Sequence, residues 1–142
     1  KHHVVGDLSE VFRTHVMREF PFPEIDGEKF CPEALIWNRI ARKYKLRYFN
    51  EPIYIAEYQP EGLTARIVEI RMKSPIATTM CYAEMVMSSI PLKERFKAAA
   101  NYWRFRCCSK DKNKIKHINV FWRCMFLLGW IMHLRDLRVT KK

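Results

Sequence analysis

The stretch EKFCPEALIWNRIARKYKLRYFNEPIYIAEYQPEGLT, residues 28 to 64, changes character in its middle and decides how the chain is divided. Its first half has the period of an amphipathic helix, because apolar residues recur at four-residue steps, at Ile36, Ile40 and Tyr44. Pro32 stands where a first helical turn accepts proline. We therefore expect a helix that begins at Glu33.

The second half of this stretch is typical of strands. KLRYF (45–49) and PIYIAEY (52–58) are rich in aromatic and β-branched residues, and turn residues join them. Upstream, apolar residues between 3 and 14 surround a bend at Gly6 and indicate one or two more strands. A helical turn over residues 15–20 and an acidic, proline-rich loop, PFPEIDGEKF, lie between these strands and the helix.

Beyond Thr64 the patterns are helical. They predict a helix in ARIVEIRM, a second after the Ser74-Pro75 start signal, and a third between Leu92 and Cys107. A polar linker, SKDKNKIK, then leads to a last helix around INVFWRCMFLLGWIMHLRDL. The expected organisation is an α/β portion with a short sheet over residues 1–64, followed by a mainly helical extension over residues 65–142.

The charge is divided at the same boundary. Residues 1–64 hold 9 Lys and Arg against 10 Asp and Glu, and residues 65–142 hold 17 against 5, so the two parts carry −1 and +12. A basic second half favours an anionic neighbour, either membrane phospholipid or nucleic acid. We find no helix-turn-helix, zinc-finger or RNA-binding signature, so we do not expect a nucleic-acid partner.

The last predicted helix contains an apolar run from Cys124 to Met132, which is far shorter than the roughly 20 residues that span a bilayer. Trp122, Phe126 and Trp130 recur every four residues, and basic residues follow them. This pattern suits a helix that lies in the interface of an anionic membrane. The alternatives are an amphipathic helix packed on its neighbours, and pairing between two copies in a homodimer.

Five cysteines are present without a CxxC pair and without zinc-finger spacing to histidines. We therefore expect no metal site in this chain and a reducing, cytoplasmic location, with peripheral attachment at the inner face of a membrane.

Several short motifs follow one another in the first half: GDLSEVFRT, FPFPE, the acidic helix start with an arginine six residues later, and YQPEGLT. In this order they resemble the C-terminal half of a family 2 glycosyltransferase with the GT-A fold. The resemblance covers roughly residues 6 to 64. It implies that the α/β portion is a truncated GT-A domain on the acceptor side of the enzyme.

The resemblance also implies roles for residues. The family's Glu-Asp pair, whose aspartate is the usual catalytic base, falls on Pro32-Glu33, so Glu33 would be the base. Because Pro and Glu replace the usual pair, Glu28 or Asp26 could share this role. Arg39 would hold the loop carboxylates through paired hydrogen bonds or lie near the diphosphate. The acceptor region would include Tyr58 and Gln59.

The complete enzyme would move a sugar from a nucleotide-sugar donor to a hydroxyl of a glycan or lipid-linked acceptor, by an inverting displacement, in polysaccharide or glycan synthesis. The sequence has no DxD motif and no nucleotide-binding βαβ unit. We therefore expect this chain to be inactive alone, without a cofactor of its own, and a divalent metal, Mg²⁺ or Mn²⁺, in the full-length enzyme. The competing class is a non-enzymatic basic helical module that binds a membrane, nucleic acid or an acidic partner.

Overall fold

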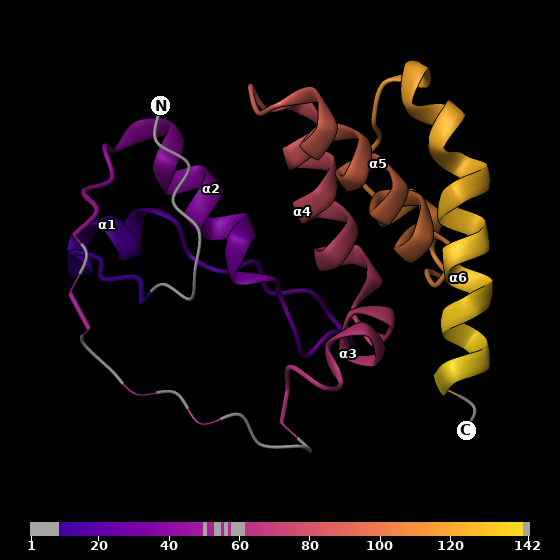
Figure 1. Ribbon diagram of the computed structural model, residues 1–142, viewed down its shortest axis with the longest axis horizontal. Helices are drawn as coiled ribbons and strands as arrows, with labels where there is room; N and C mark the ends of the chain where they lie inside the picture. The colour runs from indigo at the N-terminus through magenta and orange to yellow at the C-terminus, as the bar shows by residue number, and fades with distance from the viewer. Residues whose placement is uncertain (1–8, 50, 53–54, 56, 58–61, 141–142) are drawn as a thin grey trace.

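The computed structural model describes residues 9–49, 51, 52, 55, 57 and 62–140, and regular structure in this part of the chain is helical throughout (Figure 1). The α-helices are α1 (Thr14–Glu19), α2 (Glu33–Lys43), α3 (Ile67–Lys73), α4 (Pro75–Met87), α5 (Leu92–Arg106) and α6 (Phe126–Thr140). Two 3-10 helices, η1 (Lys112–Lys114) and η2 (Val120–Met125), lie between α5 and α6.

Helix α4 is the central element, with α1 and α2 on one side and α5 and α6 on the other (Figure 1). Its sequence, PIATTMCYAEMVM, is apolar on nearly every side, as expected for a helix that is covered all round. Cys81 packs with buried residues of α1 and α2, at Val16, Leu35, Ile36 and Ile40. Val86 packs instead with Ala98 and Ala99 of α5 and with Trp122 of η2.

Helices α5 and α6 approach closely at Gly129. The α5 residue at this point, Ala100, is buried. An added Cβ at Gly129 of α6 would lie 2.6 Å from the Ala100 carbonyl oxygen and 2.6 Å from Cβ of Trp103. Only glycine therefore fits at this crossing.

Most predicted helices are confirmed, including the turn at residues 15–20, the start of α2 at Glu33 and the start of α4 at Pro75. The last predicted helix differs, because it is divided at Phe126 into η2 and α6. Trp122 is buried against Phe96, whereas Phe126 and Trp130 are exposed. The three aromatic residues therefore do not form one face.

The expected α/β fold with a short sheet is wrong, since no described residue forms a strand. Residues 9–13 and 45–49 have no regular structure, and Leu46, Tyr48 and Phe49 are exposed. The sequence has strand propensity there, but a strand is stable only when a neighbouring strand pairs its N–H and C=O groups. The described residues supply no such neighbour. Residues 3–8, 53, 54, 56 and 58 of the predicted strands lie outside the described part.

Candidate functional site

Glu28, in the acidic loop before α2, reaches the start of α4. Its carboxylate accepts hydrogen bonds from the backbone N–H groups of Ile76, at 2.6 Å, and Ala77, at 2.8 Å. These donors need a partner from elsewhere, because the Ser74 side chain makes no cap hydrogen bond and Pro75 has no N–H. A carboxylate also suits the positive end of the helix dipole. Glu28 therefore caps α4 from a position 48 residues earlier in the chain.

The same loop forms a hollow of about 430 Å³ beside the start of α4. Acidic side chains of Glu24, Asp26 and Glu28 line it together with the apolar residues Phe22, Ile25, Phe30 and Ala77. Gly27, with φ of +81°, makes the turn between Asp26 and Glu28. The loop thus brings two of the predicted site residues, Asp26 and Glu28, to one hollow.

Glu33 lies apart from this hollow, in the first turn of α2. Its side chain is exposed, and within the described residues it has no hydrogen-bond or ion-pair partner. A larger open hollow of about 1110 Å³, between α1, α2 and residues 45–49, 51 and 52, is not lined by Glu33 either. Among the described residues, the Glu33 carboxylate is therefore exposed and unpaired at the positive end of a helix.

One of the two expectations from the sequence was that Arg39 holds the loop carboxylates. In the structure Arg39 binds a different carboxylate. Its guanidinium donates to Glu84 of α4, with Nη2–Oε1 at 2.7 Å and Nε–Oε2 at 3.2 Å. Lys116 also lies 3.3 Å from Oε1 of Glu84. Burial works to raise the pKa of Glu84, but the hydrogen bond and charge of Arg39, with Lys116, hold that pKa below its ordinary value.

Sequence reasoning missed Glu84, although the sequence carries a signal for it. Glu84 is the single charged residue of α4, which is otherwise apolar or hydroxyl-bearing. A lone charge in a helix that is apolar all round has to be paired when the helix is buried. The pattern indicates the need for a cation but not which of 26 Lys and Arg residues supplies it.

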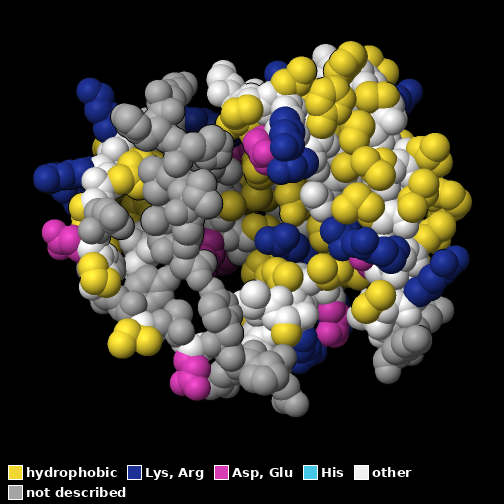
Figure 2. Space-filling model, viewed as in Figure 1, with side chains coloured by type: hydrophobic (Ala, Val, Ile, Leu, Met, Phe, Trp, Pro, Cys, Tyr) yellow, Lys and Arg dark blue, Asp and Glu magenta, His cyan; other side chains and the backbone are white. Residues whose placement is uncertain are grey.

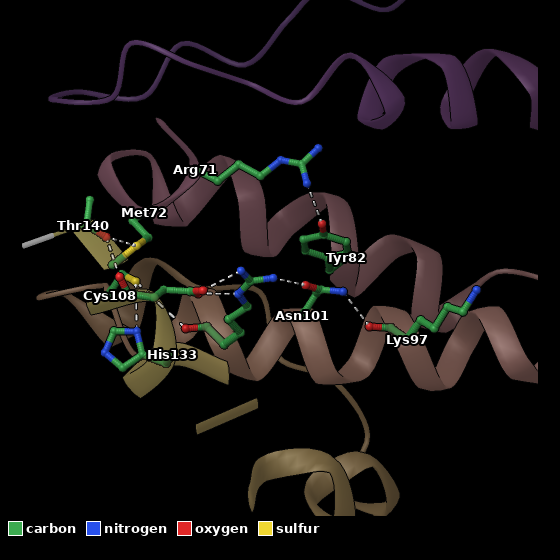
Figure 3. A network of polar contacts seen from close by, with 10 residues as sticks. Arg71, Met72, Tyr82, Lys97, Asn101, Cys108, His133 and Thr140 are labelled. Atoms are coloured by element: carbon green, nitrogen blue, oxygen red, sulfur yellow. Dashed lines mark hydrogen bonds and ion pairs between the residues drawn. The ribbon is translucent and has the colours of Figure 1, made fainter. Parts of the chain in front are cut away.

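A second group of reactive side chains lies between α5 and α6 (Figure 3). Sγ of Cys108 is 3.5 Å from Nδ1 of His133, next to the buried pair of Arg104 and Asp136. This resembles the beginning of a nucleophilic site, but burial raises the pKa of the Cys108 thiol to about 12. Because the thiolate is the nucleophile, the protonated Cys108 thiol is a poor nucleophile near neutral pH. We therefore assign the pair to packing.

The two predicted acceptor-region residues, Tyr58 and Gln59, lie outside the described residues. In the part of the chain that the structure describes, no three His, Cys, Asp or Glu side chains gather in a way that could hold a metal ion. The described part of the chain also contains no helix with the length and apolar character needed to cross a membrane.

The architecture is a basic assembly of helices around α4, with an acidic loop at the start of that helix. We found no protein-family model, no curated protein and no solved structure that matches the chain.

Proposed function

We propose that this chain forms the acceptor side of a glycosyltransferase of the family 2 type, with Glu33 as the general base. The observation that carries the proposal is the order of the motifs over residues 6 to 64, which resembles this family. Glu33 is exposed in the first turn of α2 and lines neither hollow, so the structure adds accessibility of the carboxylate but no cleft beside it.

The proposed reaction needs one proton acceptor on this chain. The acceptor hydroxyl attacks the anomeric carbon of the donor sugar, the bond to the nucleoside diphosphate breaks, and Glu33 takes the hydroxyl proton. A general base acts only if its carboxylate can approach that hydroxyl, and a carboxylate already bound to protein groups is poorly placed to do so. We place the donor site and its divalent metal outside these 142 residues, because they contain no DxD motif.

The contacts also distinguish the three candidate acids. Glu28 is held by two backbone N–H groups of α4, so its carboxylate serves the fold. Asp26 is exposed on the loop, one residue before Gly27, and remains the alternative base. Arg39 is a positioning residue in this proposal, because its bond to Glu84 fixes α2, and with it Glu33, relative to α4.

The test is sugar transfer by the full-length enzyme from nucleotide-sugar donors, with three matched amide variants. Glu33→Gln should lower kcat by two to four orders of magnitude, about the contribution of general base catalysis, and leave the melting temperature unchanged. Asp26→Asn tests the alternative base, and with Glu33 as the base it should keep kcat within about threefold. Glu28→Gln should lower the melting temperature, because it weakens the cap of α4.

A near-normal kcat for Glu33→Gln removes Glu33 from the mechanism. If Asp26→Asn alone abolishes turnover, the base is the loop aspartate. Absence of transfer from every nucleotide sugar by the intact wild-type enzyme contradicts the proposed function itself.

A further inference from the structure

Helix α6 leaves most of its apolar side chains uncovered. It has 15 residues, of which only Gly129 and Asp136 are buried. The large apolar residues around its first turns and on η2 are exposed, and we call them the η2–α6 face: Val120, Phe121, Phe126, Leu127, Leu128, Trp130 and Ile131.

The extent of exposure separates this face from ordinary surface residues. Phe121 is 63% exposed and Leu127 is 61% exposed, and both belong to the segment 120–131, in which only Trp122 and Gly129 are buried. Isolated apolar residues on a surface need no explanation, whereas a contiguous patch of this kind marks an interaction surface. Figure 2 shows a dense apolar region at the upper right, where η2 and the beginning of α6 lie in Figure 1.

Basic residues accompany this face. Arg123 of η2 and Arg135 and Arg138 of α6 are exposed. Below the apolar region in Figure 2, Lys and Arg side chains form a band across the same side of the molecule. The partner of this face must therefore combine an apolar layer with negative charge, because residues 65–142 carry a formal charge of +12.

We propose that the η2–α6 face binds the surface of an anionic lipid bilayer. The apolar side chains around η2 and the first turns of α6 enter the boundary between headgroups and acyl chains, and Arg135 and Arg138 contact lipid phosphates. A helix of 15 residues is about 22 Å long and fits in the plane of the interface. Long arginine side chains reach headgroups while their carbon stems stay on apolar surface.

The charge argues against a second copy of this chain as the occupant. Two copies that meet through this face bring two strongly positive regions together, which is unfavourable at low salt. A bilayer rich in anionic lipid supplies the opposite charge, worth about fivefold in affinity for each basic residue near its surface. This inference stands on exposure and charge and does not depend on the glycosyl-transfer proposal.

The test is co-sedimentation of the full 142-residue chain with large vesicles of neutral phosphatidylcholine alone or with about one third phosphatidylserine. We expect at least tenfold tighter binding to the anionic vesicles and a clear loss of binding in 0.5 M salt. Two double variants separate the contributions: Leu127→Ser with Ile131→Ser, and Arg135→Gln with Arg138→Gln.

The apolar double variant should weaken binding to anionic vesicles at least tenfold. The arginine double variant should reduce anionic binding by a similar factor and leave the weak binding to neutral vesicles unchanged. Lys110→Gln with Lys114→Gln removes the same charge from the exposed linker and is the matched control, expected to change binding less than threefold. Each altered side chain is exposed, so circular dichroism and the melting temperature should match the wild type.

Three results overturn the proposal: no binding to anionic vesicles, equal binding to neutral and anionic vesicles, or equal losses in the control and the Arg135–Arg138 variant. A dimer in sedimentation velocity without lipid, dissociated by Leu127→Ser with Ile131→Ser, assigns the face to a second copy instead.

Discussion

Arg39 of α2 and Glu84 of α4 bind one another through two parallel hydrogen bonds, although 45 residues separate them in the sequence. The Glu84 side chain is only 6% exposed, and Arg42 and Lys116 also lie within salt-bridge distance of it. A carboxylate so deeply buried costs several kcal/mol of desolvation, which the surrounding cations have to offset. The contact therefore adds to the apolar packing that holds α2 on α4.

We expect Glu84→Gln to lower the free energy of unfolding by about 2 to 3 kcal/mol. The amide keeps the size of the side chain but leaves the Arg39 guanidinium without its anionic partner, and the other cations are partly solvated, which moderates the loss. Urea denaturation followed by circular dichroism measures this change. A loss below about 0.5 kcal/mol would show that α2 is held mainly by its apolar contacts.

The same contact predicts a dependence of stability on pH. The pKa of Glu84 is lowered in the folded protein, so the carboxylate contributes stability above its unfolded pKa of 4.5. That contribution is lost as the pH falls below 4.5 through the folded pKa. Melting temperatures measured between pH 7 and pH 3 should fall more steeply for the wild type than for Glu84→Gln, and parallel curves would contradict this assignment.

Local patterns in the sequence identified several helices and their starts. Pro32 before α2 and Ser74-Pro75 before α4 are signals within single turns, and the structure confirms both helices. The residues that hold these helices together were not identified, because Glu28 and Glu84 find their partners 48 and 45 residues away. Sequence periodicity reports which face of a helix is apolar, and it does not report what covers that face.

The strand predictions failed for a related reason. KLRYF has aromatic and apolar residues in the pattern of a strand, but the pattern does not say whether a pairing strand is present. At the candidate site, the sequence singled out three acids, of which Asp26 and Glu28 line one hollow and Glu33 lies apart from it. Their different contacts became visible only in the structure. Glu28 binds backbone N–H groups at the start of α4, whereas Glu33 has no partner within the described residues.

Gly129→Ala should destabilise the protein by about 2 to 3 kcal/mol, because its Cβ would overlap α5 backbone at the Ala100 oxygen and the Arg104 nitrogen. In an uncrowded helix the same substitution stabilises by about 1 kcal/mol, so the sign of the change tests the close packing. Gly27→Ala is the control, since nothing lies within 4 Å and only its positive φ resists a side chain. We expect Gly27→Ala to cost about 1 kcal/mol in thermal or urea unfolding. A stabilised Gly129→Ala would show that α6 lies farther from α5.

The Arg104–Asp136 ion pair joins α5 to α6 and is buried, with Nη2–Oδ1 at 2.7 Å. Asp136→Asn should cost about 3 to 5 kcal/mol, because it leaves the Arg104 charge buried without its counter-ion. The double variant Arg104→Met with Asp136→Leu removes both charges and should recover most of that loss. Urea unfolding of the single and double variants measures the coupling. Equal losses in all variants would show that the two side chains act through packing alone.

The five cysteines should differ in reactivity according to their burial. Cys124 is exposed on η2, whereas burial raises the pKa of both Cys81 and Cys108 to about 12. At pH 7.5 a thiol with that pKa is almost entirely protonated, and the protonated form does not attack alkylating reagents. We therefore expect brief iodoacetamide treatment of the folded chain, followed by peptide mass spectrometry, to label Cys124 first. Cys81 and Cys108 should be labelled only in denaturant.

The variant Cys124→Ser is the control for this experiment and should remove the fast phase of alkylation without altering the fold. The proximity of His133 makes Cys108 the informative position, because an activating histidine would convert it to a thiolate and accelerate its labelling. Labelling of Cys108 as fast as Cys124 in the folded chain would contradict its assignment to packing. It would also direct attention to the α5–α6 contact as a reactive site.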